Sequence, residues 1–386
     1  MHDFDAITVD QLRAAGSTKW TMFPDAIGAF IAEMDFGVPP QVADVVRRAA
    51  DTQALGYLPA ADRAAAKQAT AAWLGRSFGW QVPQEHVYLL PDVLSAMRIA
   101  IHHFTPAGSP VIVPTPAYMP FLTVTPAQDR EVVEVPSILD DDGRYRLDLD
   151  AIDAAFAAGA GLLVLCNPWN PVGRVLTREE LLAVADVVDR HGGRVFADEI
   201  HAPLLLDDGP HIPYASLDER TAAHTITAVA ASKGWNVPGL KCGQMILSNP
   251  DDVAAFAPYA DDSADTVGLL GGRAAVAAYE HGQDWLDDVV GYLRGNRDLL
   301  VEMVDQIPGV RLSPVEGTYI AWLDCRELDL PGGPAQFFRR EAGVALTDGV
   351  HCGAAGRGFA RLVFAMPRPV LRQALEQMRD AVLRGR

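Results

Sequence analysis

The chain has 386 residues, of which 49% are hydrophobic and 21% charged, and its formal net charge is −18. The length suggests two domains, and the composition excludes a mostly disordered chain. The acidic excess argues against nucleic acid or an anionic membrane as the main partner, whereas a few local cations would suffice to bind a small anionic ligand.

The N-terminus and the cysteines indicate the cellular compartment of the protein. The first residues show no basic stretch followed by an apolar core, so we expect no secretory signal, and no apolar run is long enough for a membrane span. Free thiols in a reducing cytoplasm are the simplest interpretation, and no metal site is expected, because the cysteines are far apart and form no CxxC motif. They are Cys166, Cys242, Cys325 and Cys352.

The elements expected along the chain change from its start to its middle. Residues 1–45 are expected to be irregular, with Pro39-Pro40 just before a helical stretch. The middle alternates short apolar runs, typical of buried strands, with longer helical patterns. The runs are Leu89–Leu90, Val111–Val113, Leu162–Leu165, Val195–Ala197 and Ile226–Val229.

One helix of the middle section has clear boundaries in the sequence. Thr177 is a plausible N-cap, Glu180 completes a capping box three residues later, and Gly192 is a plausible helix stop. Strands that alternate with such helices predict an α/β fold, with a mainly parallel sheet covered on both faces.

The C-terminal third predicts a second, smaller α+β domain. A helical pattern runs from Trp285 to about Ile307, strand-like stretches follow at Tyr319–Leu323 and Arg361–Phe364, and a last helix starts near Arg368. We expect three parts: an N-terminal arm (1–45) that joins the small domain, a large domain (46–283) and the small domain (284–386).

Polar residues follow the apolar runs, at the end where a parallel sheet binds ligands. They offer an amine, a carboxylate, an amide, hydroxyls and a helix N-terminus. Pyridoxal phosphate needs such a set, because its aldehyde needs a lysine, its ring nitrogen a carboxylate and its phosphate free N–H groups. The spacing alone does not select this cofactor. The stretches are Asp92 to Ser95, Asn167 to Gly173, Asp198 to His201 and Ser232 to Asn236.

Three motifs carry a resemblance to a known family. They are Asn170-Pro171-x-Gly173, Asp198-Glu199-x-His201 and Ser232-Lys233-x-x-Asn236-x-x-Gly239-Leu240, in this order. The chain resembles the fold-type I pyridoxal-phosphate-dependent enzymes of the class I/II aminotransferase family over nearly its whole length. The resemblance implies that family's α/β fold, with a large cofactor-binding domain and a smaller α+β domain.

Further stretches resemble one branch of this family, the MalY/PatB-like cystathionine β-lyases. One of them departs mildly from the branch, since Glu33 stands where Asp is usual. The stretches are Lys19-Trp20, residues 30–36 (FIAEMDF), His201 where aminotransferases usually have Tyr, and residues 316–322 (EGTYIAW).

The resemblance implies a role for each residue around the cofactor ring. Lys233 forms the Schiff base and removes the Cα proton, which requires a lowered pKa. Asp198 pairs with the ring nitrogen, while Asn170 and His201 lie near the ring oxygen O3′. Tyr118 stacks on the ring. Each residue also has a simpler alternative. Lys233 would be a surface lysine, Asp198 a carboxylate that caps a strand end, and Asn170 a residue that forms a turn. His201 would be a core histidine or a metal ligand, and Tyr118 a core residue. A strand has to end between Asp198 and His201, because strict alternation would put them on opposite faces.

The resemblance also implies where the cofactor phosphate binds. Its partners are the N–H groups of Val93 and Leu94, the hydroxyl of Ser232 and the cation of Lys241. The family usually has a Gly-rich turn here, whereas this chain has Asp92, whose alternative role is to cap the following helix.

The resemblance implies roles for two more residues. One would bind the cofactor of a neighbouring subunit, and the other would bind the substrate. Tyr57 resembles the tyrosine that reaches the phosphate of the neighbouring subunit, which implies a homodimer with shared active sites; a Tyr in a turn is the alternative. Arg361 resembles the arginine that binds the substrate α-carboxylate, with a surface salt bridge as the alternative. Trp169 and Trp235 are expected either to wall the substrate pocket or simply to pack.

The branch resemblance implies a pyridoxal 5′-phosphate-dependent carbon–sulfur β-lyase. It would cleave cystathionine or a related cysteine S-conjugate to a thiol, pyruvate and ammonia. An aminotransferase of class I/II is the alternative, because the cofactor residues serve both reactions equally. A cofactor-holding regulator without turnover is a third hypothesis. The implied partners are a small-molecule amino-acid substrate and a second copy of the chain.

Overall fold

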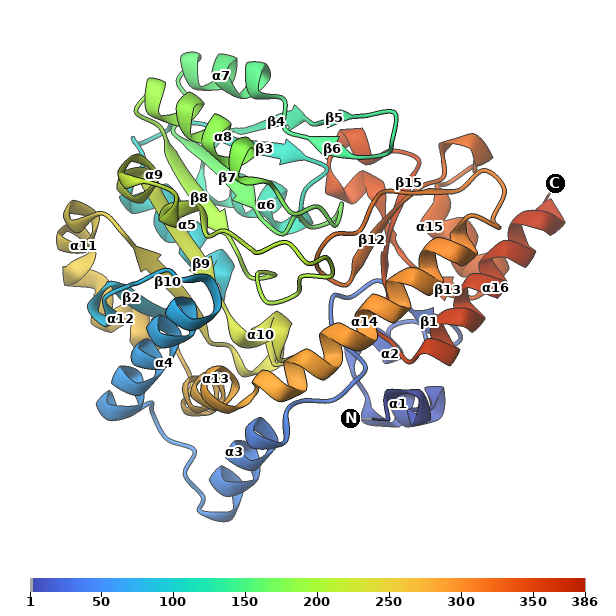
Figure 1. Ribbon diagram of the computed structural model, residues 1–386, viewed down its shortest axis with the longest axis horizontal. Helices are drawn as coiled ribbons and strands as arrows, with labels where there is room; N and C mark the ends of the chain where they lie inside the picture. The colour runs from blue at the N-terminus through green and yellow to red at the C-terminus, as the bar shows by residue number, and fades with distance from the viewer. Residues whose placement is uncertain (1–2, 386) are drawn as a thin grey trace.

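A seven-stranded sheet forms the centre of the larger part of the molecule (Figure 1). The computed structural model describes residues 3–385. Strand β10 is antiparallel to both of its neighbours and all other pairs are parallel, which confirms the mainly parallel sheet. The spatial order is β2 (Val87–Leu90), β10 (Gly243–Leu247), β9 (Thr225–Val229), β8 (Arg194–Asp198), β7 (Leu162–Cys166), β3 (Val111–Thr115) and β4 (Val132–Pro136).

Helices cover both faces of this sheet. Successive side chains of each strand point to opposite sides, and they are mostly apolar on both sides, so each face needs a covering layer. In β2, Tyr88 and Leu90 join the core on one face, while Val87 and Leu89 join the core on the other. Helix α5 (Val93–His103) packs in the first core. The opposite face is covered by α4 (Ala60–Phe78), α7 (Leu149–Ala157), α8 (Arg178–Arg190) and α13 (Leu269–His281).

Helix α8 begins and ends where the sequence predicts. The Thr177 hydroxyl accepts a hydrogen bond from the Glu180 amide, and the Glu180 carboxylate accepts one from the Thr177 amide, so the capping box is complete. Gly192, just past the helix, has a φ of 60°, in the left-handed region that ends many helices.

A second, antiparallel sheet lies in the C-terminal part of the chain (Figure 1). Helix α14 (Gln283–Val304) runs from the side of the large sheet toward this smaller sheet and packs on α16 (Arg368–Gly385). The predicted long helix, two strands and last helix are therefore all present. The order of the sheet is β11 (Arg311–Leu312), β12 (Ile320–Asp324), β15 (Phe359–Val363) and β14 (Thr347–Asp348).

The N-terminal region is more regular than the sequence analysis expected. Helix α1 (Val9–Ala15) follows a capping box formed by Thr8 and Gln11, a local signal that the analysis missed. Strand β1 (Ile27–Gly28) pairs in parallel with β13 (Val344–Ala345), a long-range contact that no local pattern predicts. The helix expected after Pro39-Pro40 is α3 (Pro40–Asp51).

The remaining helices and strands are short, and β5 and β6 pair with each other in a separate antiparallel sheet. They are α2 (Thr18–Thr21), β5 (Ile138–Leu139), β6 (Tyr145–Arg146), α6 (Met119–Val124), α9 (Glu219–His224), α10 (Ala231–Gly234), α11 (Pro250–Phe256), α12 (Ala260–Asp265) and α15 (Pro334–Phe337).

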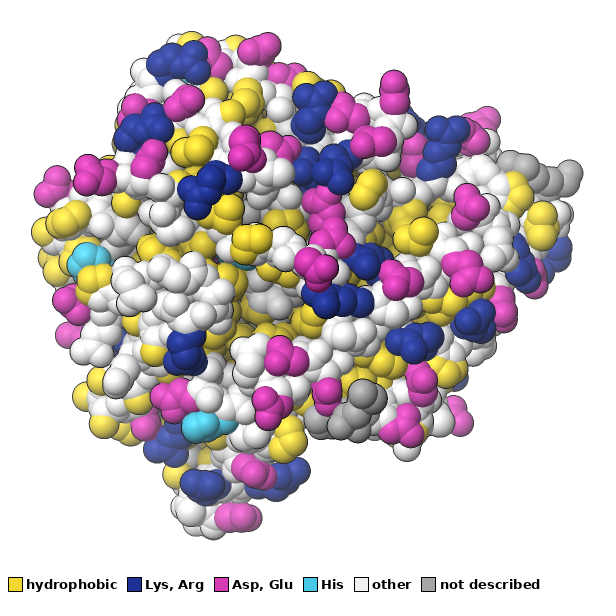
Figure 2. Space-filling model, in the orientation of Figure 1, with side chains coloured by type: hydrophobic (Ala, Val, Ile, Leu, Met, Phe, Trp, Pro, Cys, Tyr) yellow, Lys and Arg dark blue, Asp and Glu magenta, His cyan; other side chains and the backbone are white. Residues whose placement is uncertain are grey.

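The surface carries charges of both signs. Figure 2 shows acidic and basic side chains interspersed over the face that it presents, so the net charge of −18 is not gathered there in one patch. Among residues 3–385, no helix is long and apolar enough to cross a membrane, and no group of three or more His, Cys, Asp or Glu could hold a metal ion.

Candidate active site

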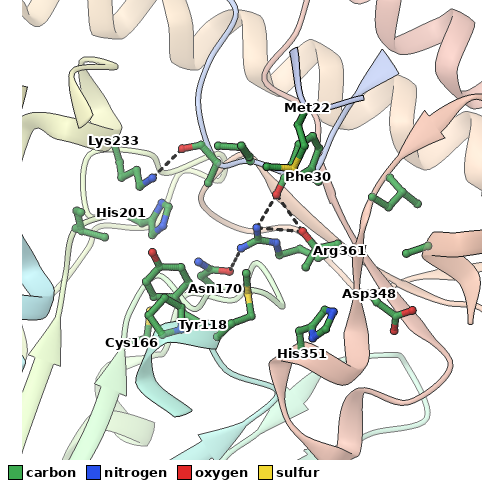
Figure 3. A pocket seen from close by; sticks show the side chains of 18 of the residues that line it. Met22, Phe30, Tyr118, Cys166, Asn170, His201, Lys233, Asp348, His351 and Arg361 are labelled. Carbon is green, nitrogen blue, oxygen red and sulfur yellow. Dashed lines mark hydrogen bonds between the residues drawn. The ribbon is translucent and has the colours of Figure 1, made fainter. Parts of the chain in front are cut away.

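A cavity of about 640 Å³ lies where the carboxyl ends of the parallel strands meet the C-terminal sheet and the N-terminal segment (Figure 3). Strands β3, β7, β8 and β9 end at this edge, as expected for a ligand site in an open parallel sheet. The predicted residues in its wall are Val93, Tyr118, Asn170, Asp198, His201, Lys233 and Arg361. The fold thus brings together side chains that are up to 268 residues apart in the chain (361 − 93 = 268).

Lys233 lies on α10, the short helix that follows β9. Its side chain is half-buried because it faces the cavity, and its Nζ donates a hydrogen bond of 2.7 Å to the carbonyl of Ala32. The pKa of this amine is lowered to about 8, chiefly by burial and then by the nearby Arg361 charge, against the opposing effect of Glu33 and Asp198. An amine with this pKa is available as a base and a nucleophile near neutral pH.

Asp198 is the last residue of β8 and is almost fully buried. Its carboxylate accepts a hydrogen bond of 3.1 Å from the amide of Ile200. The pKa of this carboxyl group is raised to about 7, because burial outweighs the lowering effects of that hydrogen bond and of the Lys233 charge. A cationic nitrogen placed against Asp198 would therefore hold it in the ionised form.

His201 lies three residues beyond the end of β8 and still faces the cavity, because the strand ends at Asp198, as the sequence required. Its Nδ1 lies 2.9 Å from the Thr318 hydroxyl. Burial, together with the charges of Lys233 and Arg361, holds the pKa of this imidazole well below its ordinary value, so the ring is neutral.

Arg361 projects from β15 and is 2% exposed, so it is not in a surface salt bridge. Nη2 donates to the carbonyl of Phe30 at 2.8 Å and Nη1 to Oδ1 of Asn170 at 3.2 Å (Figure 3). Nη2 also approaches the Thr347 hydroxyl at 3.3 Å, whereas Nε has no hydrogen-bond partner in residues 3–385. Within that range the guanidinium meets no carboxylate, so a buried cation and a free donor remain for an anionic ligand.

The predicted phosphate site lies at the start of α5. Asp92 is the N-cap of this helix and accepts a hydrogen bond of 2.9 Å from the Ser95 amide, which is the capping role given as its alternative. The carboxylate of Asp92 also pairs with Lys241 at 3.3 Å. Val93 and Leu94 form the first turn, where backbone N–H groups have no partner within the helix and can bind an anion.

Other predicted residues lie farther from the cavity. Ser232 is half-buried beside Lys233, and neither Ser232, Leu94 nor Lys241 is in the cavity wall. Tyr57 is 92% exposed and its backbone pairs with Gly268, so a single chain does not bring it to its own cavity. Tyr118, in contrast, is in the cavity wall; it precedes α6, is half-buried and packs against Phe121 edge to face.

The two tryptophans pack in the core and do not line the cavity. The indole N–H of Trp235 donates to the carbonyl of Gly282 at 3.0 Å, and that of Trp169 donates to the carbonyl of Pro116 at 3.0 Å. Both indoles are buried, so packing is the correct alternative for them.

Two kinds of contact at the site were not predicted from the sequence: the backbone carbonyls of the N-terminal segment and the hydroxyl of Thr318. Backbone carbonyls of Phe30 and Ala32 accept hydrogen bonds from Arg361 and Lys233. A carbonyl is present in every residue, so no residue pattern could have identified these two. Thr318 lay inside the branch stretch 316–322, but the stretch did not reveal what its hydroxyl contacts.

The chain is similar to known proteins over nearly its whole length. Residues 28–378 match the family described as Aminotransferase class I and II. A cystathionine beta-lyase of Corynebacterium glutamicum is 36% identical over 374 residues, which cover 96% of this chain and 98% of that protein. The cystathionine beta-lyase PatB of Bacillus subtilis is 30% identical over 93% of both chains. A crystal structure described as a candidate PLP-dependent beta-cystathionase of Corynebacterium diphtheriae has a TM-score of 0.92, with 39% identity over 98% of both chains.

Proposed function

The chain belongs to the aminotransferase class I and II family, and from this we propose that it is a pyridoxal 5′-phosphate-dependent carbon–sulfur β-lyase. It cleaves cystathionine or a related cysteine S-conjugate to a thiol, pyruvate and ammonia. The observation that carries the choice of lyase over aminotransferase is the 36% identity to a cystathionine beta-lyase over 96% of the chain. The cavity supports either reaction, because both use the same cofactor residues.

The residues of the cavity fit this cofactor. Asp198 is a buried carboxylate for the ring nitrogen, and the first turn of α5 offers N–H groups for the phosphate, supported by Ser232 and Lys241. In addition, we assign Tyr118 to stack on the ring and Asn170 and His201 to contact its O3′ oxygen, because all three line the cavity. When bound, pyridoxal phosphate supplies an aldehyde that joins an amine covalently and a ring that withdraws electrons from the substrate Cα.

Side chains of the protein bind the substrate and transfer its proton. Arg361 binds the substrate α-carboxylate through its free donor and thereby orients Cα toward Lys233. The neutral amine of Lys233 removes the Cα proton, which its lowered pKa permits. The carbon–sulfur bond breaks and the sulfur leaves as a thiolate. Water then converts the remaining three-carbon amino acid fragment to pyruvate and ammonia.

We further propose that the active unit is a homodimer in the cytoplasm, in which Tyr57 reaches the phosphate site of the partner. The 92% exposure of the Tyr57 side chain supports this role, because a large aromatic residue this exposed is available to another chain. The four cysteines form no disulfide, which suits a reducing compartment. The boundary that we propose between large domain (46–283) and small domain (284–386) is supported by the break between α13 and α14.

The first test is pyruvate release from the cofactor-loaded protein with L-cystathionine and without any keto acid. We expect pyruvate, ammonia and a free thiol in equal amounts. Lys233→Ala should abolish this reaction together with the visible absorbance of the lysine-bound cofactor. Lys67→Ala, which removes an amine outside the cavity wall, should leave both unchanged. Amino transfer only after addition of a keto acid would instead identify an aminotransferase.

A further inference from the structure

Thr318 has a backbone conformation that β-branched residues rarely adopt. Its φ is 62°, in the left-handed region, where Gly or Asn would be accommodated at lower cost. The side chain is completely buried. A Thr at such a position indicates that its side chain makes a contact that Gly could not make.

The segment around Thr318 is held in place by both strand-end loops of the site. The amide of Thr318 donates to the carbonyl of Leu204 at 2.6 Å, in the loop that follows His201. The amide of Gly317 donates to the carbonyl of Gly173 at 2.9 Å, in the loop that follows Asn170. A Cβ atom on Gly317 would lie 2.8 Å from Val175, so the segment packs closely here and position 317 favours glycine.

Glu316 anchors the same segment through its side chain. One carboxylate oxygen accepts from the Val175 amide at 2.9 Å and from Nε of Arg174 at 3.3 Å. The other oxygen pairs with Arg144 at 2.8 Å. The position of the Thr318 hydroxyl is thus set by contacts on three sides.

The Thr318 hydroxyl has one partner in residues 3–385, Nδ1 of His201 at 2.9 Å. The other ring nitrogen, Nε2, has no hydrogen-bond partner in the same range, and the ring lies in the cavity wall between Lys233 and Asn170 (Figure 3). A neutral imidazole carries one proton, on either Nδ1 or Nε2.

The two tautomers differ in how they satisfy the buried hydroxyl. If Nδ1 carried the proton, it would donate to the Thr318 oxygen, and the hydroxyl proton would be left without an acceptor. If Nε2 carries it, the hydroxyl donates to Nδ1 and the Nε2–H group faces the cavity. Because an unsatisfied buried donor is costly, the second arrangement is favoured.

We propose that Thr318 is a positioning residue that holds His201 as the neutral Nε2–H tautomer, so that the imidazole offers an N–H donor to an oxygen acceptor in the cavity. The identity of this acceptor as the ring oxygen of the cofactor rests on the proposed function. The tautomer itself does not rest on it, because it follows from the hydrogen bonds of the chain.

The test is the 15N NMR spectrum of the cofactor-loaded, full-length protein labelled in its ten histidines. Loss of one pair of signals in His201→Gln identifies His201. We expect a proton-bearing Nε2 and a bare Nδ1, which have widely separated 15N shifts. Thr318→Val, which keeps the shape and removes the hydroxyl, should move the two shifts toward each other, and Thr318→Ser should restore the separation.

A matched control removes a buried hydroxyl elsewhere. Thr227 on β9 is fully buried and its hydroxyl has no hydrogen-bond partner within residues 3–385, so Thr227→Val should leave the His201 signals unchanged. A proton on Nδ1 in the unmodified protein would overturn the proposal, and this result needs no variant of Thr318. Unchanged His201 shifts in Thr318→Val would overturn it as well.

Turnover gives a second readout. Thr318→Val should lower kcat about tenfold with little change in KM. Removing the hydrogen-bond partner that orients a metal-bound histidine causes a loss of similar size. Thr318→Ser should recover the lost kcat. If the unmodified protein released no pyruvate from cystathionine, the proposed function would fail, while the NMR result would still decide the tautomer.

Discussion

Burial sets the chemistry of the three ionisable side chains at the centre of the site. It lowers the pKa of Lys233 to about 8, raises that of Asp198 to about 7 and lowers that of Arg361. Keeping such groups out of water costs stability, and folds retain them mainly where they function. All three shifts are consequences of the cavity, because the same residues on the surface would titrate normally.

The shift at Lys233 predicts a pH-dependent stability difference in the cofactor-free chain. The folded amine has a pKa of about 8 against 10.5 when unfolded, so burial of the charged form destabilises the fold by up to about 3 kcal/mol. The unfolded state binds the extra proton between these values, so this cost is full below pH 8 and disappears as the pH rises to 10.5. Lys233→Met should therefore unfold at a higher temperature than the unmodified protein at pH 7, and the difference should vanish near pH 10.5. An equal difference at both pH values would contradict the shift.

The free donor of Arg361 predicts a defect in substrate binding. Arg361→Ala should raise KM for cystathionine about 100-fold, since the charge-assisted hydrogen bond that it loses is worth up to about 3 kcal/mol. Arg361→Lys keeps the positive charge but loses the planar guanidinium group, so its KM should lie between those of the unmodified protein and Arg361→Ala. Arg311→Ala, which removes an exposed arginine outside the cavity wall, is the control and should behave as the unmodified protein. Unchanged KM in Arg361→Ala would show that this residue does not bind the carboxylate.

At the scale of elements, the site depends on a segment without regular structure that runs from Phe30 to Gly37. A buried ion pair holds it, with Nζ of Lys19 2.9 Å from the carboxylate of Asp35, which also accepts from the indole of Trp20 at 2.9 Å. Ala32 lies in this segment and presents its carbonyl to Lys233. The N-terminal arm, which we expected to be irregular, thus forms part of the cavity wall.

Asn236 ties this segment to the loop that follows α10, the short helix that carries Lys233. Its side chain accepts from the amide of Met34 at 2.9 Å and donates to the carbonyls of Met34 and Gly37 at 2.9 and 2.8 Å. Asn236→Gly should lower the free energy of unfolding by about 2–3 kcal/mol, at about 1 kcal/mol for each lost hydrogen bond. Asn236→Ala should cost about 1 kcal/mol more, because the φ of 57° at this position suits Gly.

Urea titration checks both variants of Asn236. Asn249→Ala serves as a comparison, because Asn249 caps α11 away from the N-terminal segment. It should cost about 1 kcal/mol and leave KM unchanged. Asn236→Gly with the stability of the unmodified protein would mean that the loop and the segment are held by other contacts.

At the scale of the whole molecule, one cavity is built from the large sheet, the C-terminal sheet and the N-terminal segment. A single hydrophobic core runs from α4 and α13 into α14 and α16, so the two sheets share packing. The proposed phosphate site includes Lys241, whose side chain is 61% exposed. This is where the proposed dimer would contribute Tyr57 from the partner subunit.

Mixing of two inactive variants tests this shared site. Tyr57→Ala and Lys233→Ala each impair every site of their own homodimer. In a hybrid dimer, one site combines an intact Lys233 with an intact Tyr57 from the other chain, so co-expression should restore activity in one of the two sites. Purified hybrids without activity, or a protein that is monomeric in light scattering, would remove Tyr57 from the site.

The sequence by itself determined the central strands of the large sheet, helices α8, α14 and α16, and the motifs that mark the site. Apolar runs with polar residues after them lie on β3, β7, β8 and β9, and the capping box of α8 is local, so both follow from neighbouring residues. The motif residues Asn170, Asp198 and Lys233 lie together because parallel strands end at the same edge.

Only the tertiary structure decided what these residues contact. It placed Arg361 in the cavity without a carboxylate partner, aligned the carbonyl of Ala32 with Lys233 and set the Thr318 hydroxyl against His201. These contacts join residues that are 117 to 331 positions apart, and several use backbone atoms that every residue has. The pKa values of the site depend on the same burial, which exists only once distant segments have packed against one another.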